Sequence, residues 1–186
     1  MATPEHLDIA ANRAAVKYTA GETWRRLAWI FGRLLFRFSP RPLFGWRRLV
    51  LRAFGARIGR HVHVYPTAEV EMPWQLEVGD WSAIGEYVVV YSLGRISIGA
   101  QVTVSQRAHL CAGTHDFRRA DMPLLRPPIR IEDRAWICAD AFVGPDVVVG
   151  EGAVVGARGV VVRSVPPWTV VAGNPARPVG SRAPTK

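Results

Sequence analysis

Residues 131–166 read IEDRAW-ICADAF-VGPDVV-VGEGAV-VGARGV-VVRSVP, which are six hexads in a row without an insertion. A β-branched aliphatic residue begins each hexad, at Ile131, Ile137, Val143, Val149, Val155 and Val161. The fifth place is always small or β-branched, at Ala135, Ala141, Val147, Ala153, Gly159 and Val165. A period of six fits neither a helix nor the simple alternation of a strand. It is typical of hexapeptide β-helices.

This repeat predicts an all-β solenoid of stacked turns. Each hexad supplies a short strand and a corner, and its branched aliphatic side chain points into a narrow interior. A single hexad cannot bury its own apolar face, so the array is stable only when turns stack on one another. Glycine follows three of the aliphatic residues, at Gly144, Gly150 and Gly156. We expect these glycines to supply corner conformations that a Cβ atom makes costly.

The hexads extend back to Ile58, so the solenoid is predicted to span residues 58–176 in about five turns. Two-residue insertions, at 76–77 and 96–97, separate groups of three hexads and are interpreted as small corner adjustments. The register is lost over residues 116–130, which contain Pro123, Pro127 and Pro128. This stretch is predicted to be a loop that projects from a corner, and long loops on rigid scaffolds usually carry function.

The N-terminal part is predicted to be helical and basic. Residues 1–21 are expected to be a flexible lead-in, and residues 22–57 a basic amphipathic helical segment and cap. Its first helix, over 22–38, has apolar residues at helical spacing, namely Trp24, Leu27, Ala28, Phe31, Leu34, Leu35 and Phe38. Ten arginines and no acidic residue lie between Thr23 and Arg60. Two compatible interpretations follow: the helix caps the open end of the solenoid, or it rests on an anionic membrane surface.

The composition limits the partners and the compartment. The net charge of +9 is carried almost entirely by arginine, which suggests anionic partners. No nucleic-acid-binding motif accompanies this charge, so we expect no nucleic-acid partner. Two cysteines do not form a disulfide framework, and the N-terminus lacks a signal-peptide pattern. We expect a cytoplasmic protein, attached peripherally to the inner membrane face if the basic helix binds lipid. Residues 177–186 are expected to be a basic tail.

His115 is the residue best placed for chemistry. It lies in the GTHDF motif at residues 113–117, at the corner where the long loop leaves the hexads. Imidazole titrates near neutral pH, which suits a general base. His109 lies six residues earlier, on another side of the prism, so the two imidazoles do not converge on a metal within one chain, and no metal is expected. Cys111 and Cys138 are interpreted as small packing residues.

Several motifs carry a resemblance to a known family. The hexads, GTHDF and the GNPA sequence at 173–176 resemble the hexapeptide-repeat acyltransferases. The segments SPRPLFGWRRLVLRAFGARIG (39–59) and VVVYSLGRISIG (88–99) resemble, more narrowly, sugar O-acetyltransferases of the colanic-acid-biosynthesis type. The resemblance covers about residues 22–180. It implies a left-handed parallel β-helix, a homotrimer, and acetyl transfer from acetyl-CoA to a hydroxyl of a sugar or lipid-linked glycan in exopolysaccharide biosynthesis.

The same resemblance assigns roles to individual residues. His115 would be the general base in direct transfer. Positions at the acceptor are Ser92, Asp116 and Trp136, and positions along acetyl-CoA are Ala139, Ala157, Val162, Arg163 and Arg177. Ser92 stands where relatives often carry Asn, and Val162 stands where they often carry Thr. Two other functions are considered, a metal enzyme resembling gamma-class carbonic anhydrase, whose three histidines would meet at a subunit boundary, and a non-enzymatic hexapeptide scaffold.

Overall fold

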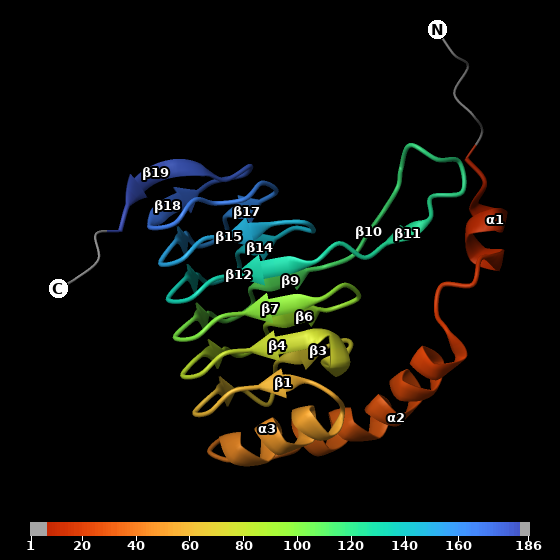
Figure 1. The fold of residues 1–186 in the computed structure, drawn as a ribbon, viewed down its shortest axis with the longest axis horizontal. Coiled ribbons are helices and arrows are strands. Elements are labelled where there is room, and N and C mark those ends of the chain that lie inside the picture. The colour runs from red at the N-terminus through yellow and green to blue at the C-terminus, as the bar shows by residue number, and fades with distance from the viewer. Residues whose placement is uncertain (1–6, 183–186) are drawn as a thin grey trace, which may run out of the picture.

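The computed structural model describes residues 7–182 and shows a left-handed parallel β-helix with helices at one end (Figure 1). Each turn adds one strand to each of three parallel sheets, which we call sheets A, B and C. The chain passes from A to B to C, so the prism has an A–B, a B–C and a C–A corner. Five complete turns stack, and β18 (Thr169–Ala172) begins a sixth. The predicted solenoid and its number of turns are confirmed.

The strands follow the hexad register. Sheet A contains β1 (Arg57–Ile58), β4 (Leu76–Val78), β7 (Ile96–Ile98), β12 (Ile129–Ile131) and β15 (Val148–Val149). Sheet B contains β2 (His63–Val64), β5 (Ala83–Ile84), β8 (Thr103–Val104), β13 (Trp136–Ile137), β16 (Val154–Val155), β18 and the antiparallel β19 (Arg177–Ser181). Sheet C contains β3 (Glu69–Val70), β6 (Val89–Tyr91), β9 (His109–Cys111), β14 (Phe142–Val143) and β17 (Val160–Val161).

The core is a column of stacked aliphatic side chains. The first residue of each hexad, from Ile58 to Val161, is at most 7% exposed. Parallel pairing places these residues in register, as where Val104 pairs with Ile137 and Ile137 pairs with Val155. In residues 131–166 the fifth places are also buried, so the interior of the prism there is filled by two positions of each hexad. The predicted inward positions are therefore confirmed.

The glycines of the hexads have a different role from the one expected. None of Gly144, Gly150 and Gly156 has a positive φ. The left-handed conformation occurs at the fourth place, with φ of 54–64° at His61, Trp81, Tyr87, Gln101, Arg107, Arg134, Asp140, Asp146, Gly152 and Arg158. A Cβ atom on Gly150 would lie 2.5 Å from the backbone nitrogen of Pro167. Glycine is needed there because the next turn approaches closely, and not because of its own dihedral angles.

The two-residue insertions extend strands and do not adjust corners. Leu76 and Ile96 begin the three-residue strands β4 and β7, and Ile129 begins β12 in the same register. All three side chains are buried. The corner interpretation is therefore wrong, because sheet A uses the extra residues to widen the core.

The helices α2 (Ala20–Arg37) and α3 (Phe44–Ala53) cover the N-terminal end of the solenoid (Figure 1). The helix α1 (Ile9–Ala14) lies away from that end, against residues 120–122, and the short 3₁₀ helix η1 (Pro73–Gln75) follows later in the chain. Thr19 and Glu22 form a capping box at the start of α2. Leu51 of α3 is fully buried against the first turn. Arg47 of α3 is also fully buried, and its guanidinium donates to the carbonyl of Val64 at 2.5 Å. Its burial lowers the pKa of this guanidinium.

Two segments differ from the expected boundaries. Residues 7–21, expected to belong to a flexible lead-in, contain α1 and contact residues 120–122 through hydrogen bonds. Residues 1–6 of that lead-in lie outside the described residues. Residues 177–181, expected to belong to a tail, form β19, because the chain reverses after Ala172 and pairs with β18. Within residues 7–182, no helix is both long enough and apolar enough to cross a membrane.

Candidate active site

A β-hairpin leaves the solenoid at the C–A corner. After β9 the chain forms β10 (Thr114–His115), which pairs with β11 (Leu124–Leu125) in antiparallel orientation, and it returns to the solenoid at β12. His115 faces Leu124 across this ladder. Figure 1 shows the hairpin projecting away from the stacked turns, beside α1. The segment expected to be a long loop therefore has its own strands, which hold His115 at its base.

One hydrogen bond fixes the proton of His115. Its Nδ1 atom lies 2.7 Å from the carbonyl oxygen of Met122. A carbonyl oxygen only accepts, so Nδ1 carries the hydrogen of the neutral imidazole. The Nε2 atom then has a free lone pair. The ring is half-buried, and in this tautomer Nε2 is the nitrogen that can accept a proton.

The N-terminal segment holds the hairpin in place. The side-chain amide of Asn12 donates to the carbonyls of Asp121 at 2.7 Å and Met122 at 2.6 Å. Arg126 of the hairpin forms an ion pair with Glu22 of α2 at 2.6 Å. The backbone N–H of Thr19 lowers the pKa of the Glu22 carboxyl most, and Arg126 adds to this effect. The carbonyl that orients His115 is thus fixed by a residue more than a hundred positions away.

Two of the predicted acceptor residues bind backbone atoms instead. The Ser92 side chain is fully buried, and its hydroxyl lies 3.0 Å from both the nitrogen and the oxygen of Met72. It is therefore placed where an acceptor cannot touch it, which corrects that prediction. Asp116 accepts from the backbone N–H of Arg118 at 3.1 Å. It stabilises the turn of the hairpin, and Met122 rather than Asp116 provides the observed hydrogen bond to the imidazole.

The other predicted site residues lie on sheet B and at two different corners. Trp136 is on sheet B, where its Nε1 atom donates to the hydroxyl of Ser105 at 2.9 Å. Ala139 and Ala157 occupy the B–C corner one turn apart, and Arg177 begins β19 at the same side of sheet B. Val162 and Arg163 follow β17 at the C–A corner, which is also the corner of the His115 hairpin. Within one chain, the site residues therefore form two separate groups.

Sequence reasoning gave no role to the outer face of sheet C beside the hairpin. His109 lies there between the rings of Tyr91 and Phe142, with centroid distances of 6.4 and 5.4 Å. Burial lowers the pKa of His109, which favours the neutral form of this imidazole. Burial also raises the pKa of Tyr91. A six-residue spacing alone could show that these residues face outward, but not that His109 would be half-buried there.

The cysteines do not have the environment of a nucleophile. Burial is the largest cause that raises the pKa of Cys111, and it also raises the pKa of Cys138. Both thiols are free and half-buried. A reactive cysteine needs a lowered pKa, so these side chains behave as packing residues.

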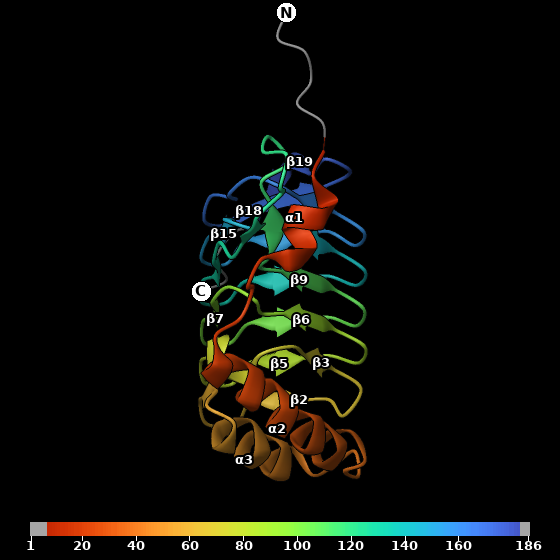
Figure 2. The ribbon, with the colours of Figure 1, turned by 90° about the vertical axis from the view of Figure 1, so that its right-hand side faces the viewer.

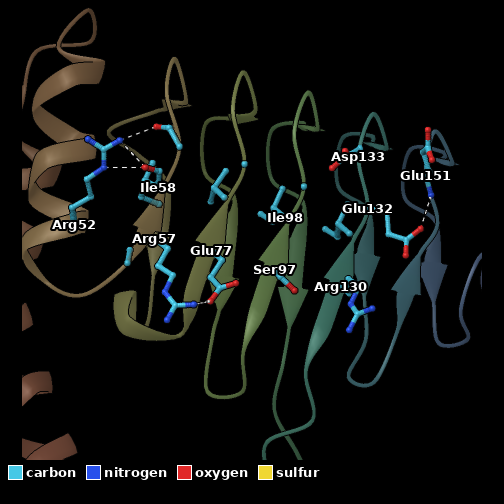
Figure 3. Close-up of a pocket in the computed structure, with 16 residues that line it drawn as sticks. Arg52, Arg57, Ile58, Glu77, Ser97, Ile98, Arg130, Glu132, Asp133 and Glu151 are labelled. Atoms are coloured by element: carbon cyan, nitrogen blue, oxygen red, sulfur yellow. Dashed lines mark hydrogen bonds and ion pairs between the residues drawn. The ribbon is translucent and has the colours of Figure 1, made fainter.

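A broad hollow of about 910 Å³ lies over sheet A, and it contains none of the predicted site residues. Figure 3 shows Arg57, Glu77, Ser97 and Arg130 in a row across four neighbouring strands of sheet A. Arg57 pairs with Glu77 at 2.8 Å, so part of its charge is neutralised internally. Among residues 7–182, no three His, Cys, Asp or Glu side chains are grouped so that they could hold a metal ion.

Comparisons with known proteins identify relatives, although no family model matches the chain. The putative colanic acid biosynthesis acetyltransferase WcaF of Escherichia coli (strain K12) is 40% identical over 161 residues, covering 87% of this chain and 88% of that protein. The galactoside O-acetyltransferase of Escherichia coli (strain K12) is 25% identical over 138 residues, covering 70% and 66% of the two chains.

A solved structure gives the same fold. The hexapeptide-repeat acetyltransferase VCA0836 from Vibrio cholerae O1 biovar eltor, complexed with acetyl coenzyme A, is 26% identical, with a TM-score of 0.81. The alignment covers 91% of this chain and 93% of that one. The identity to WcaF extends over most of both sequences. The chain therefore belongs to the family of the colanic acid biosynthesis acetyltransferases, within the hexapeptide-repeat acetyltransferases.

Proposed function

We propose that this protein transfers an acetyl group from acetyl-CoA to a hydroxyl of a sugar or lipid-linked glycan in exopolysaccharide synthesis, with His115 as the general base. One observation carries the proposal: the Met122 carbonyl holds the proton of His115 on Nδ1 and leaves Nε2 free to accept another. The names of two relatives, which refer to colanic acid biosynthesis and to galactoside acetylation, support the class of acceptor.

His115 solves the main chemical difficulty of the reaction. A sugar hydroxyl has too high a pKa to attack a thioester unaided at neutral pH, so a base must remove its proton during the attack. Nε2 of His115 accepts that proton as the oxygen bonds to the acetyl carbon. The Met122 carbonyl stabilises the resulting imidazolium through Nδ1–H. His115 then returns the proton to the sulfur as the carbon–sulfur bond breaks.

The B–C corner has features that fit an elongated anionic ligand. At this corner the third place of the hexad is a small residue on successive turns, at Ala139 and Ala157. Arg158 and Arg177 are exposed on the same edge, where guanidinium groups can donate to phosphate oxygens. These residues would hold acetyl-CoA. Arg163 lies on the C–A edge instead, two turns beyond β9 in sheet C.

A homotrimer would bring the two edges together. His115 and Arg163 belong to the C–A corner, whereas Ala139, Ala157 and Arg177 belong to the B–C corner of the same prism. A single thioester cannot contact both groups unless neighbouring chains contribute one edge each. Cyclic packing of three prisms about a common axis provides three such grooves. The proposal therefore includes a site that is shared between subunits.

The test uses purified full-length protein, acetyl-CoA and a panel of soluble glycans. Release of the free CoA thiol gives the rate, and mass spectrometry identifies the acetylated product. We expect His115→Ala to lower kcat by about 10²–10⁴-fold, the usual size of a general-base effect, while acetyl-CoA still binds. His61→Ala is the matched control, because His61 is an exposed imidazole at the A–B corner of the first turn.

Two results would contradict the proposal. The proposed activity is contradicted if the wild-type protein, in its native assembly, acetylates none of the glycan hydroxyls. The role of His115 is wrong if His115→Ala retains a rate close to that of His61→Ala.

A further inference from the structure

The helices α2 and α3 expose a continuous apolar surface. We call this surface the helical apolar face; it consists of Trp24, Leu27, Ile30, Phe31, Leu34, Leu35, Phe38, Leu43, Trp46 and Leu49. The members up to Leu43, in α2 and the following loop, are 46–80% exposed, and the two members in α3 are 40% and 58% exposed. The helical apolar face includes the same stripe that the sequence pattern assigned to one side of the helix. Soluble monomers rarely expose so many large apolar side chains together.

The solenoid does not cover this face, because α2 packs with its other side. Trp29 is 2% exposed, and its Nε1 atom donates to the Val70 carbonyl at 2.8 Å. Phe36 is also 2% exposed. A Cβ atom on Gly32 would lie 2.5 Å from the ring of Phe54, so the helix approaches its neighbour closely at that point. The capping role and the apolar stripe thus use different faces of one helix.

The two helices join around an apolar hollow. This hollow has a volume of about 490 Å³ and is lined by Leu34, Leu35, Phe38, Ser39, Pro40, Leu43 and Trp46. The Trp46 indole donates to the Leu35 carbonyl at 3.0 Å and fixes the junction. Trp24 and Trp46 are amphipathic rings of the kind that favour the boundary between water and hydrocarbon. The surface therefore has the composition to receive acyl chains.

The charge near this face favours an anionic occupant. Residues 23–60 contain ten arginines and no acidic residue, but Arg47 is buried and Arg57 pairs with Glu77 over sheet A. Arg26 and Arg33 share Glu71 of the solenoid, at 3.1 and 3.3 Å. Among the described residues, Arg25 and Arg37 are exposed and form no ion pair with a carboxylate. These cations lie on the same helix as the exposed apolar stripe, an arrangement that favours binding to anionic lipids.

We propose that the helical apolar face binds the surface of an anionic lipid bilayer. The two helices would lie in the plane of the interface, with their apolar side chains among the acyl chains and their arginines among the headgroups. This inference does not depend on the acetyl-transfer proposal. It has a consequence for that proposal, because Glu22, in the first turn of α2, pairs with Arg126 of the hairpin. The helix α2 would then contact the bilayer through its apolar side chains and the hairpin through Glu22 near its N-terminus.

The test is co-sedimentation of the full-length protein with vesicles. The vesicles contain phosphatidylglycerol and phosphatidylcholine, or phosphatidylcholine alone. We expect binding to the anionic vesicles that weakens as salt is added. The double variant Phe31→Glu/Phe38→Glu should bind at least about tenfold more weakly, because two aromatic side chains no longer enter the bilayer. Arg25→Gln/Arg37→Gln should lose about fivefold per arginine on anionic vesicles and little on phosphatidylcholine.

Val179→Glu is the matched control, because Val179 is 65% exposed in β19 at the opposite end of the solenoid. Its vesicle binding should equal that of the wild type. Circular dichroism and light scattering confirm the fold and mass of each variant. The proposal is overturned if the wild type does not sediment with anionic vesicles, or if Phe31→Glu/Phe38→Glu binds them as well as Val179→Glu does. A change in oligomeric mass without a change in vesicle binding would instead make this face a contact between copies. Acetyl transfer to a soluble glycan is measured in parallel, so failure of either proposal is seen separately.

Discussion

At His115, a single backbone carbonyl determines which ring nitrogen carries the proton. The Met122 oxygen accepts from Nδ1 of His115 and also from the amide of Asn12. The histidine itself could be predicted, because its residue type and its place at an interrupted corner are visible in the sequence. Its partner could not, since any residue type has a carbonyl group. Asn12 carried no signal either, because it lies 110 residues from Met122 in the chain.

Asn12 is expected to be a positioning residue for His115. Replacing it with Ala or with the isosteric Asp removes the donor that holds the Met122 carbonyl. We expect kcat to fall about fivefold to thirtyfold, the worth of one hydrogen bond near a reacting group, with the KM for acetyl-CoA unchanged. Steady-state kinetics of Asn12→Ala, Asn12→Asp and the neighbouring surface variant Arg13→Ala measure this. If Asn12→Asp keeps wild-type kcat, the side chain only fills space.

At the scale of the element, the hexad determines which side chains are buried but not how closely the turns approach. The first and fifth places were predictable because every strand meets the same interior. How closely two corners approach depends on the backbone of the next turn, so the role of the hexad glycines could not be predicted from the repeat. The apolar stripe of α2 is a second example. Its periodicity predicts an apolar face of the helix, but not what covers that face. The hairpin strands were missed because residues 116–130 lack any period.

Gly150 provides a direct test of this close approach. A Cβ atom there meets the backbone of Pro166 and Pro167 at 2.5–2.9 Å, and backbone atoms cannot move aside easily. We expect Gly150→Ala to lower the free energy of unfolding by about 1–3 kcal/mol, as overpacking usually does. In Gly180→Ala, by contrast, nothing lies within 4 Å of the added atom. Chemical denaturation of both variants measures the difference, and equal stabilities would show that the corner can relax.

At the scale of the whole molecule, one N-terminal segment caps the solenoid, contacts the hairpin and carries the helical apolar face. Figures 1 and 2 show α1 beside the hairpin and α2 extending toward the base of the solenoid. The period of six predicted the solenoid, whereas its handedness and the trimer came from resemblance to relatives. A shared site could not be derived from one sequence. The positions of His115 at one corner and Ala157 at another supply the physical reason to expect it.

The most direct test of the shared catalytic groove is subunit complementation. His115→Ala removes the base, and Ala157→Trp should block the B–C edge, so each variant alone should be inactive. When the two are co-expressed with different tags and purified as mixed trimers, each trimer has one groove with an intact His115 on one chain and an intact edge on the next. The account predicts recovery of roughly a third of the wild-type kcat in such trimers. Mixed trimers as inactive as the separate variants would contradict it, because every site would then lie within a single chain.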